Sequence, residues 1–144
     1  MILGGCRCGA VRYRIADERP PITYACHCTI CQRATGSSFA HQLLVSEATL
    51  FVQGDLIEAS VVGPSGANGL NRHCAACLTR IYNTNDRRPG LAIVRAGTVD
   101  GSERLSPGLH IYVGTKQPWI VLPDGVPAFE ENAPIEVWTR LLAT

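Results

Sequence analysis

Cys6-Arg-Cys8 and Cys74-Ala-Ala-Cys77 are the two stretches that decide how this chain folds. In extended backbone both thiols of a C-x-C pair point to one face, because side chains alternate along a strand. A C-x-x-C pair presents two sulfur atoms from a single turn, and zinc prefers four ligands in a tetrahedron. We therefore predict a closed structural zinc site that joins the start of the chain to its middle, made by Cys6, Cys8, Cys74 and Cys77.

A third cysteine motif, Cys26-His-Cys-Thr-Ile-Cys31, supplies three thiols within six residues. Three local ligands leave one position of a tetrahedral ion free, and catalytic zinc sites keep such an open position. We predict a second zinc ion at Cys26, Cys28 and Cys31, so two ions per chain. Two alternatives stay open: closure of this site by a histidine such as His41 or His110, and an iron–sulfur or redox cluster, since soft thiolates also suit iron.

The composition favours one domain over residues 1–144, with 46% hydrophobic and 17% charged residues. The net charge is +1 and no block of like charges occurs, so no basic stripe indicates a nucleic-acid partner. No apolar run reaches the ~18 residues of a membrane span, and Met1 to Gly5 leaves no room for a secretory signal before Cys6. We expect a cytoplasmic protein, in which reduced thiols favour metal binding over disulfides. The low share of charge suggests a homo-oligomer.

Short apolar runs separated by Gly and Pro turns predict a mainly β fold with minor short helices. Helices are expected over 29–35, with Thr29 as the cap and Gly36 as the stop, and over 135–142. The polar segment 83–90 is expected to be a loop. The expected strands are 10–15, 22–25, 38–45, 49–53, 56–62, 70–73, 80–82, 91–96 and 110–113.

The cysteine motifs resemble those of the glutathione-dependent formaldehyde-activating enzymes, a family that includes the centromere-protein-V-like domains. The resemblance rests on Gly4-Gly-Cys-Arg-Cys-Gly9, Cys26-His-Cys-Thr-Ile-Cys-Gln-Arg-Ala-Thr-Gly-Ser37 with Phe39, and Cys74-Ala-Ala-Cys77. Weaker matches are His110-Ile-Tyr-Val113, Lys116-Gln-Pro-Trp119 and Phe129-Glu130, so the likeness runs through nearly the whole chain in order.

This resemblance implies stacked antiparallel sheets in a tent-like, zinc-containing fold, with the same division into a structural and a catalytic zinc site. It also implies a carbon–sulfur lyase that acts on S-hydroxymethylglutathione, the adduct of glutathione and formaldehyde. One position departs from the family pattern: Leu78 stands where a glycine usually follows the C-x-x-C pair. A turn with positive φ at this position would strain a leucine.

Few other residues suggest a role in this chemistry. His27 is the nearest group able to shuttle a proton, although a supporting hydrogen-bond donor or a surface residue is the plainer interpretation. Arg33, Ser37 and Lys116 are candidates to bind a glutathione-like thiol substrate, or else solvated surface and turn residues. Trp119 and Trp138 are expected in the core. The competing functions are a zinc-stabilised, non-catalytic binding or scaffolding module and a thiol-based redox sensor.

Overall fold

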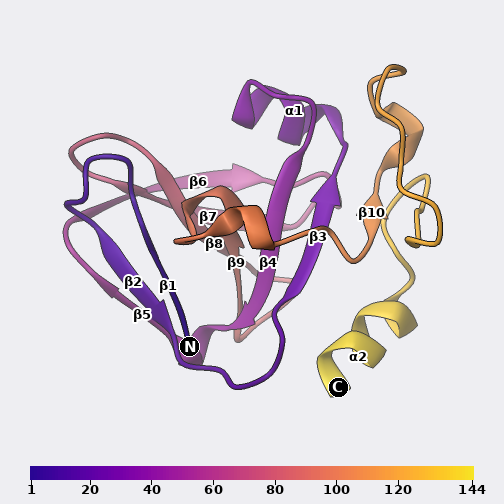
Figure 1. Ribbon diagram of the computed structural model, residues 1–144. Coiled ribbons are helices and arrows are strands. Elements are labelled where there is room, and N and C mark those ends of the chain that lie inside the picture. The colour runs from indigo at the N-terminus through magenta and orange to yellow at the C-terminus, as the bar shows by residue number, and fades with distance from the viewer.

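The computed structural model describes residues 1–144 and contains two β-sheets and two α-helices (Figure 1). A seven-stranded sheet has the order β10-β3-β4-β9-β8-β7-β6, and a three-stranded sheet has the order β1-β2-β5. All strand pairs are antiparallel except β10–β3. The mainly β class is therefore confirmed. The strands are β1 Ile2–Gly5, β2 Arg12–Ile15, β3 Ile22–Cys26, β4 Ala40–Ser46, β5 Leu50–Gln53, β6 Leu56–Val62, β7 Asn68–Cys74, β8 Arg80–Asn85, β9 Leu91–Arg95 and β10 His110–Ile111; the helices are α1 Thr29–Thr35 and α2 Ile135–Ala143.

The first hydrophobic core lies between the two sheets. Tyr13 and Ile15 of β2 are buried while the intervening Arg14 is exposed, as the period of two requires. On β4, Leu43 and Val45 face the same core. The residue between Leu43 and Val45 on β4 points to the opposite face of the large sheet, because side chains alternate along a strand. The small sheet does not cover that face, where a second core forms.

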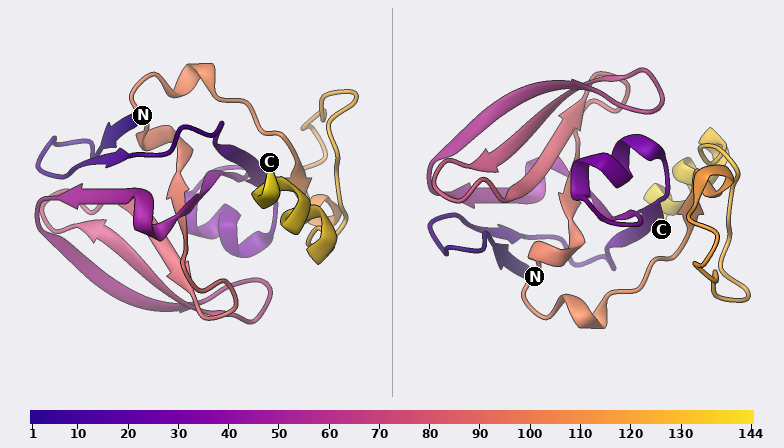
Figure 2. Two further views of the ribbon diagram at one scale, coloured as in Figure 1. Left: turned by 90° about the horizontal axis from the view of Figure 1, so that it is seen from below. Right: turned by 90° about the horizontal axis from the view of Figure 1, so that it is seen from above.

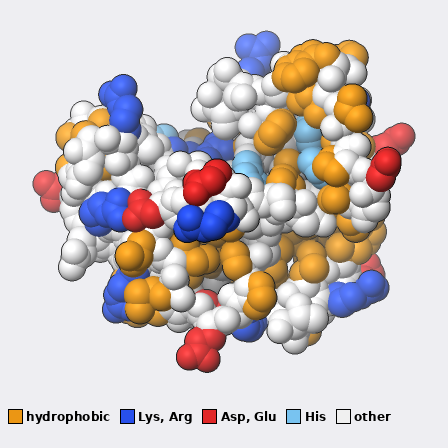
Figure 3. All heavy atoms as spheres, in the orientation of Figure 1, with side chains coloured by type: hydrophobic (Ala, Val, Ile, Leu, Met, Phe, Trp, Pro, Cys, Tyr) orange, Lys and Arg blue, Asp and Glu red, His pale blue; other side chains and the backbone are white.

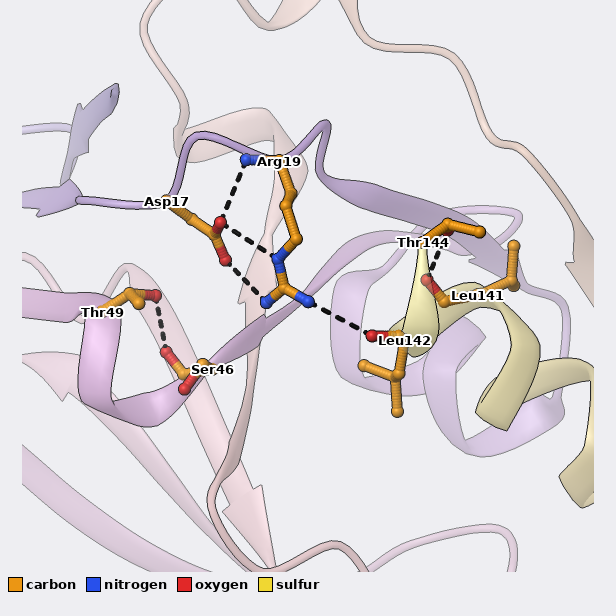
Figure 4. Close-up of polar contacts among 7 residues, drawn as sticks. All are labelled: Asp17, Arg19, Ser46, Thr49, Leu141, Leu142 and Thr144. Atoms are coloured by element: carbon orange, nitrogen blue, oxygen red, sulfur yellow. Dashed lines mark hydrogen bonds and ion pairs between the residues drawn. The ribbon is translucent and has the colours of Figure 1, made fainter.

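The second core lies on the opposite face of the seven-stranded sheet and is closed by the C-terminal segment, drawn in yellow in Figures 1 and 2. Trp138 of α2 packs edge-on against Tyr24, with ring centroids 5.1 Å apart, and the Arg88 guanidinium lies 4.5 Å from its ring centroid. Figure 4 shows how Arg19 connects the segment between β2 and β3 to α2: it pairs with Asp17 and donates to the carbonyl oxygen of Leu142, at 3.2 Å. Neither helix is long and apolar enough to cross a membrane.

Three expectations about the elements need correction. β1 was not expected, because its sequence lacks alternation; its Gly4 lies so close to Tyr13 that a Cβ atom there would be 2.3 Å from the phenol oxygen. β8 continues to Asn85, so 83–90 is only partly a loop. β10 ends at Ile111, since Tyr112 has φ 55°. Trp138 is a core residue as predicted, whereas Trp119 is 71% exposed.

Candidate metal and substrate site

Four cysteines from two distant parts of the chain meet beside the first core. Cys6 and Cys8 follow β1, Cys74 ends β7, and Cys77 lies in the next turn. All four sulfur atoms lie within 4.8 Å of one another, with Cys6 and Cys8 at 3.5 Å and Cys8 and Cys74 at 3.8 Å. The group could hold one metal ion, as the sequence predicts, and would tie the small sheet to the large one.

Leu78 closes the turn of this four-cysteine cluster in the left-handed region, with φ 62°. Its amide donates to the carbonyl oxygen of Cys74 at 2.9 Å, and its side chain is 61% exposed. Few packing contacts therefore compensate for the backbone conformation. The positive φ suspected at this position is present, and the strain falls on a leucine.

Cys26, Cys28 and Cys31 form a second cluster, because β3 ends where α1 begins. Cys26 is the last residue of β3, and Cys28 caps α1 by accepting a hydrogen bond from the Cys31 amide at 3.2 Å. The cap is thus Cys28 and not Thr29, while Gly36 ends the helix with φ 64° as expected. The three sulfur atoms lie within 4.8 Å of one another, and no other Cys, His, Asp or Glu joins the group.

The three thiols cannot ionise independently. Hydrogen bonds from the sulfur atoms of Cys26 and Cys31 lower the pKa of Cys28 to about 3. The same contact with Cys28 raises the pKa of Cys26. Ionisation of one thiol therefore disfavours ionisation of its neighbours, and a bound metal ion would favour the thiolate form of all three.

A cavity of about 370 Å³ opens beside Cys26 and Cys31, on the face of the large sheet that the C-terminal segment covers. This volume lies within the ~300–1,000 Å³ range of small-molecule sites. Aromatic side chains form one wall, and polar side chains of β7 and β8 form the other. The wall residues used below are Tyr24, Tyr112, Trp138, Asn71, Arg80 and Asn83.

The polar wall of the cavity is not predicted from the sequence. The polar segment around Asn83 predicts a loop, yet Asn83 pairs with Asn71 across β7 and β8 and lines the cavity. Arg95 ends an otherwise apolar strand and is close enough to the thiols for Cys31 to oppose the burial that lowers its pKa. A charged residue within a buried strand pattern was the signal that could have identified it.

His27 lies between two cysteines in sequence but on the other face of the sheet. Its ring is fully buried, its Nε2 is 2.9 Å from His110 Nδ1, and its ring packs on Phe39. His110 and His41 both pair with Ala25, so these two imidazoles share the face opposite Cys26. Burial lowers the pKa of His27 to about 4.

The predicted substrate residues do not line the cavity. Arg33 and Ser37 lie in a shallow surface depression beyond α1. The Ser37 amide donates to Thr35 Oγ1 at 3.1 Å, so this serine belongs to the turn that ends the helix. Lys116 donates its Nζ proton to the carbonyl oxygen of Ile120 at 3.1 Å. Acidic and basic side chains are scattered over the face drawn in Figure 3 and form no single-sign patch there.

Comparisons with known proteins identify the family of this chain. A protein of Halomonas elongata, named provisionally as a glutathione-dependent formaldehyde-activating enzyme, is 28% identical over 126 residues, which cover 83% of this chain and 80% of that protein. The crystal structure of a Rhodobacter sphaeroides protein shares the fold with a TM-score of 0.53 and 17% identity, over 88% of this chain and 98% of that one. The model of the glutathione-dependent formaldehyde-activating enzyme family matches residues 1–115 and so includes all seven cysteines. The chain therefore belongs to the glutathione-dependent formaldehyde-activating enzyme family.

Proposed function

We propose that this protein is a zinc-dependent carbon–sulfur lyase that cleaves and re-forms S-hydroxymethylglutathione. The observation that carries the proposal is the group of Cys26, Cys28 and Cys31, which has no fourth protein ligand and borders a cavity large enough for a small thiol. The family and the Halomonas elongata relative support a glutathione- and formaldehyde-related activity.

The donor set fits zinc. With Zn–S bonds of ~2.3 Å, tetrahedral geometry places neighbouring sulfur atoms about 3.8 Å apart. The sulfur separations of 3.5 Å and 3.8 Å around Cys8 are close to this value. We assign one zinc ion to the four-cysteine cluster as a structural ion and one to the three-cysteine cluster as the catalytic ion.

The chain contributes geometry and shielding to this reaction. Bound zinc supplies a Lewis acid with one coordination position open to a sulfur or oxygen atom. Cys26, Cys28 and Cys31 would hold it beside the cavity, which Tyr24 and Trp138 line with apolar surface. In the cleavage the C–S bond breaks with its electrons going to sulfur, the hydroxyl proton leaves, and the C=O bond of formaldehyde forms. The released proton goes to the sulfur or to solvent, so no oxidant or reductant is required.

His27 has a positioning role in this proposal. Its amide donates to the Ile111 carbonyl at 3.0 Å, and its own carbonyl accepts from Gln32 Nε2 at 2.9 Å and Thr115 Oγ1 at 3.0 Å. These bonds fix the segment that carries Cys26 and Cys28. The imidazole faces away from the cavity, so we assign it no proton transfer.

Exchange spectroscopy tests the proposal. Glutathione mixed with ¹³C-formaldehyde forms the adduct slowly, and NMR exchange measures the rate at which its carbon returns to free formaldehyde. The purified protein should accelerate this exchange and contain about two zinc ions per chain. Protein treated with a chelator that removes only the more labile ion should lose the acceleration. A zinc-loaded protein that leaves the exchange rate unchanged would support the non-catalytic binding module instead.

A further inference from the structure

Two half-buried arginine side chains lie beside the cavity without an acidic partner. Arg80 begins β8 and lines the cavity, and Arg95 ends β9. The ion pairs of this protein join other arginines to Asp or Glu, and none of them includes Arg80 or Arg95. Withdrawing a cation from water is costly unless charged or hydrogen-bonding partners compensate it, and neither guanidinium has an anionic partner.

Individual atoms of this region are also unsatisfied. Arg80 donates from Nη2 to Asn83, but its Nε has no hydrogen-bond partner, and the same is true of Arg95 Nη1. Asn71 Oδ1, on the neighbouring strand, is a buried acceptor without a partner. Most buried polar groups of folded proteins are satisfied. Asn71 and Arg80 line the cavity, and Arg95 pairs in register with Gln42, which also lines it. Unsatisfied atoms in this position indicate a polar ligand.

The charges that act on these arginines come from very few groups. Burial and the positive charge of Arg95 lower the pKa of Arg80 to about 10, against the effect of Cys31 and Tyr24. Burial likewise lowers the pKa of Arg95, against the effect of Cys31 and Tyr24. No carboxylate contributes to either. The two cations are thus close to each other and to the thiols.

We propose that Arg80 and Arg95 bind a carboxylate group of the thiol substrate. A guanidinium presents paired N–H donors that match the two oxygen atoms of a carboxylate. A carboxylate held here would lie next to Cys31, so one molecule could place its sulfur at the three-cysteine cluster and its anionic end at the arginines. The site selects acidic thiols over neutral ones of the same size. The identity of the ligand as a thiol rests on the proposed lyase function, whereas the carboxylate site does not.

In the competing role, the arginines only balance the negative charge of the cysteine sulfur atoms. The two roles differ in what a ligand's carboxylates contribute. If the arginines bind the ligand, esterifying its carboxylates weakens binding; if they balance the thiolates, esterification has no effect and removal of an arginine reduces metal retention.

Calorimetric titration with S-methylglutathione separates these roles, because its blocked sulfur makes binding independent of turnover. The zinc-loaded protein should bind S-methylglutathione about 10–100-fold more tightly than its diethyl ester, the usual effect of charge-assisted hydrogen bonds. This acid-to-ester ratio should fall close to one in Arg95→Met and partly recover in Arg95→Lys. Arg33→Met, which removes a charge outside the cavity, should leave it unchanged. A ratio measured on one sample does not depend on the folded fraction.

The inference is overturned if wild-type protein binds the acid and the ester equally, if it binds neither, or if Arg95→Met keeps the wild-type ratio. An intact ratio in a protein that does not accelerate adduct exchange would contradict the lyase proposal and leave the carboxylate site standing.

Discussion

The four-cysteine and three-cysteine clusters are built from the same type of side chain but differ in which parts of the chain supply it. The first draws its ligands from both ends of a 72-residue stretch, Cys6 to Cys77, and lies where the small sheet meets the large one. The second takes all its ligands from the junction of β3 and α1 and lies beside a cavity. A metal ion in the first would therefore join two parts of the fold, whereas one in the second would add little to chain connectivity.

This difference shows how sequence separation relates to function in a metal site. Ligands far apart in sequence close a long loop, which makes ion binding part of the folding free energy. Ligands from six consecutive residues close no long loop, and the surrounding sheet positions them without the ion. Such a site can leave one position vacant without loss of the fold, which is what a catalytic site requires.

The largest expected effect comes from Cys74→Ser. Structural zinc contributes about 10 kcal/mol in small metal-dependent domains, comparable with the whole stability of a domain, about 5–15 kcal/mol. Cys74 is also completely buried. We expect the variant to aggregate or to lack a cooperative thermal transition by circular dichroism. A variant that melts like the wild type would show that the four-cysteine cluster is not the structural one.

Cys28→Ser should affect function and leave the fold intact. A serine oxygen can still accept the cap hydrogen bond from the Cys31 amide, so the melting temperature should change by only a few degrees. Metal analysis should find about one zinc ion fewer per chain, and adduct exchange should fall to the uncatalysed rate. If this variant unfolds as Cys74→Ser does, the two clusters do not have separate roles.

Lowering the pH should decrease the stability of the fold, because imidazoles lie on the sheet face opposite the three-cysteine cluster. Burial lowers the pKa of His27 to about 4 and also lowers the pKa values of His41 and His110. Between about pH 6.5 and pH 4 the unfolded chain binds more protons than the folded one, so stability is complete above this window and falls as the pH decreases.

His41→Gln provides the matched control for this effect. It removes one titrating imidazole and keeps every cysteine, so acid loss of metal acts equally on both proteins. Urea denaturation at pH 7 and pH 5 should give a smaller stability loss for the variant than for the wild type. An equal or larger loss would contradict the histidine contribution.

The smallest effect concerns the turn of the four-cysteine cluster. Leu78→Gly should relieve the left-handed backbone, which costs an L-residue about 1–2 kcal/mol, and should lose little packing because the side chain is mostly exposed. Part of the gain is offset by the greater freedom of glycine in the unfolded chain. We expect the melting temperature to rise by about 3 °C; a decrease would show that the leucine makes contacts that outweigh the strain.

Much of the fold followed from local patterns. The strand over 56–62 and the stop at Gly36 occur as expected, because alternation and a glycine cap are local properties. The strand character of Asn83 was missed, because polarity usually marks a loop and here marks a cavity wall. Arg33 and Lys116 are predicted as substrate residues for their charge alone, whereas the arginines near the thiols come from β8 and β9, which are distant from Cys31 in sequence.

The sequence by itself determined the cysteine groups, because the ligand count and spacing of a thiolate metal site are local chemistry, and it determined the mainly β class. Only the tertiary structure decided which side chains share the cavity with Cys31. Strand register brings Arg80, Arg95 and Asn71 to one face and His27 to the other. The physical reason is that a strand exposes alternate residues on opposite faces, so neighbours in sequence are separated by the sheet while residues of distant strands meet.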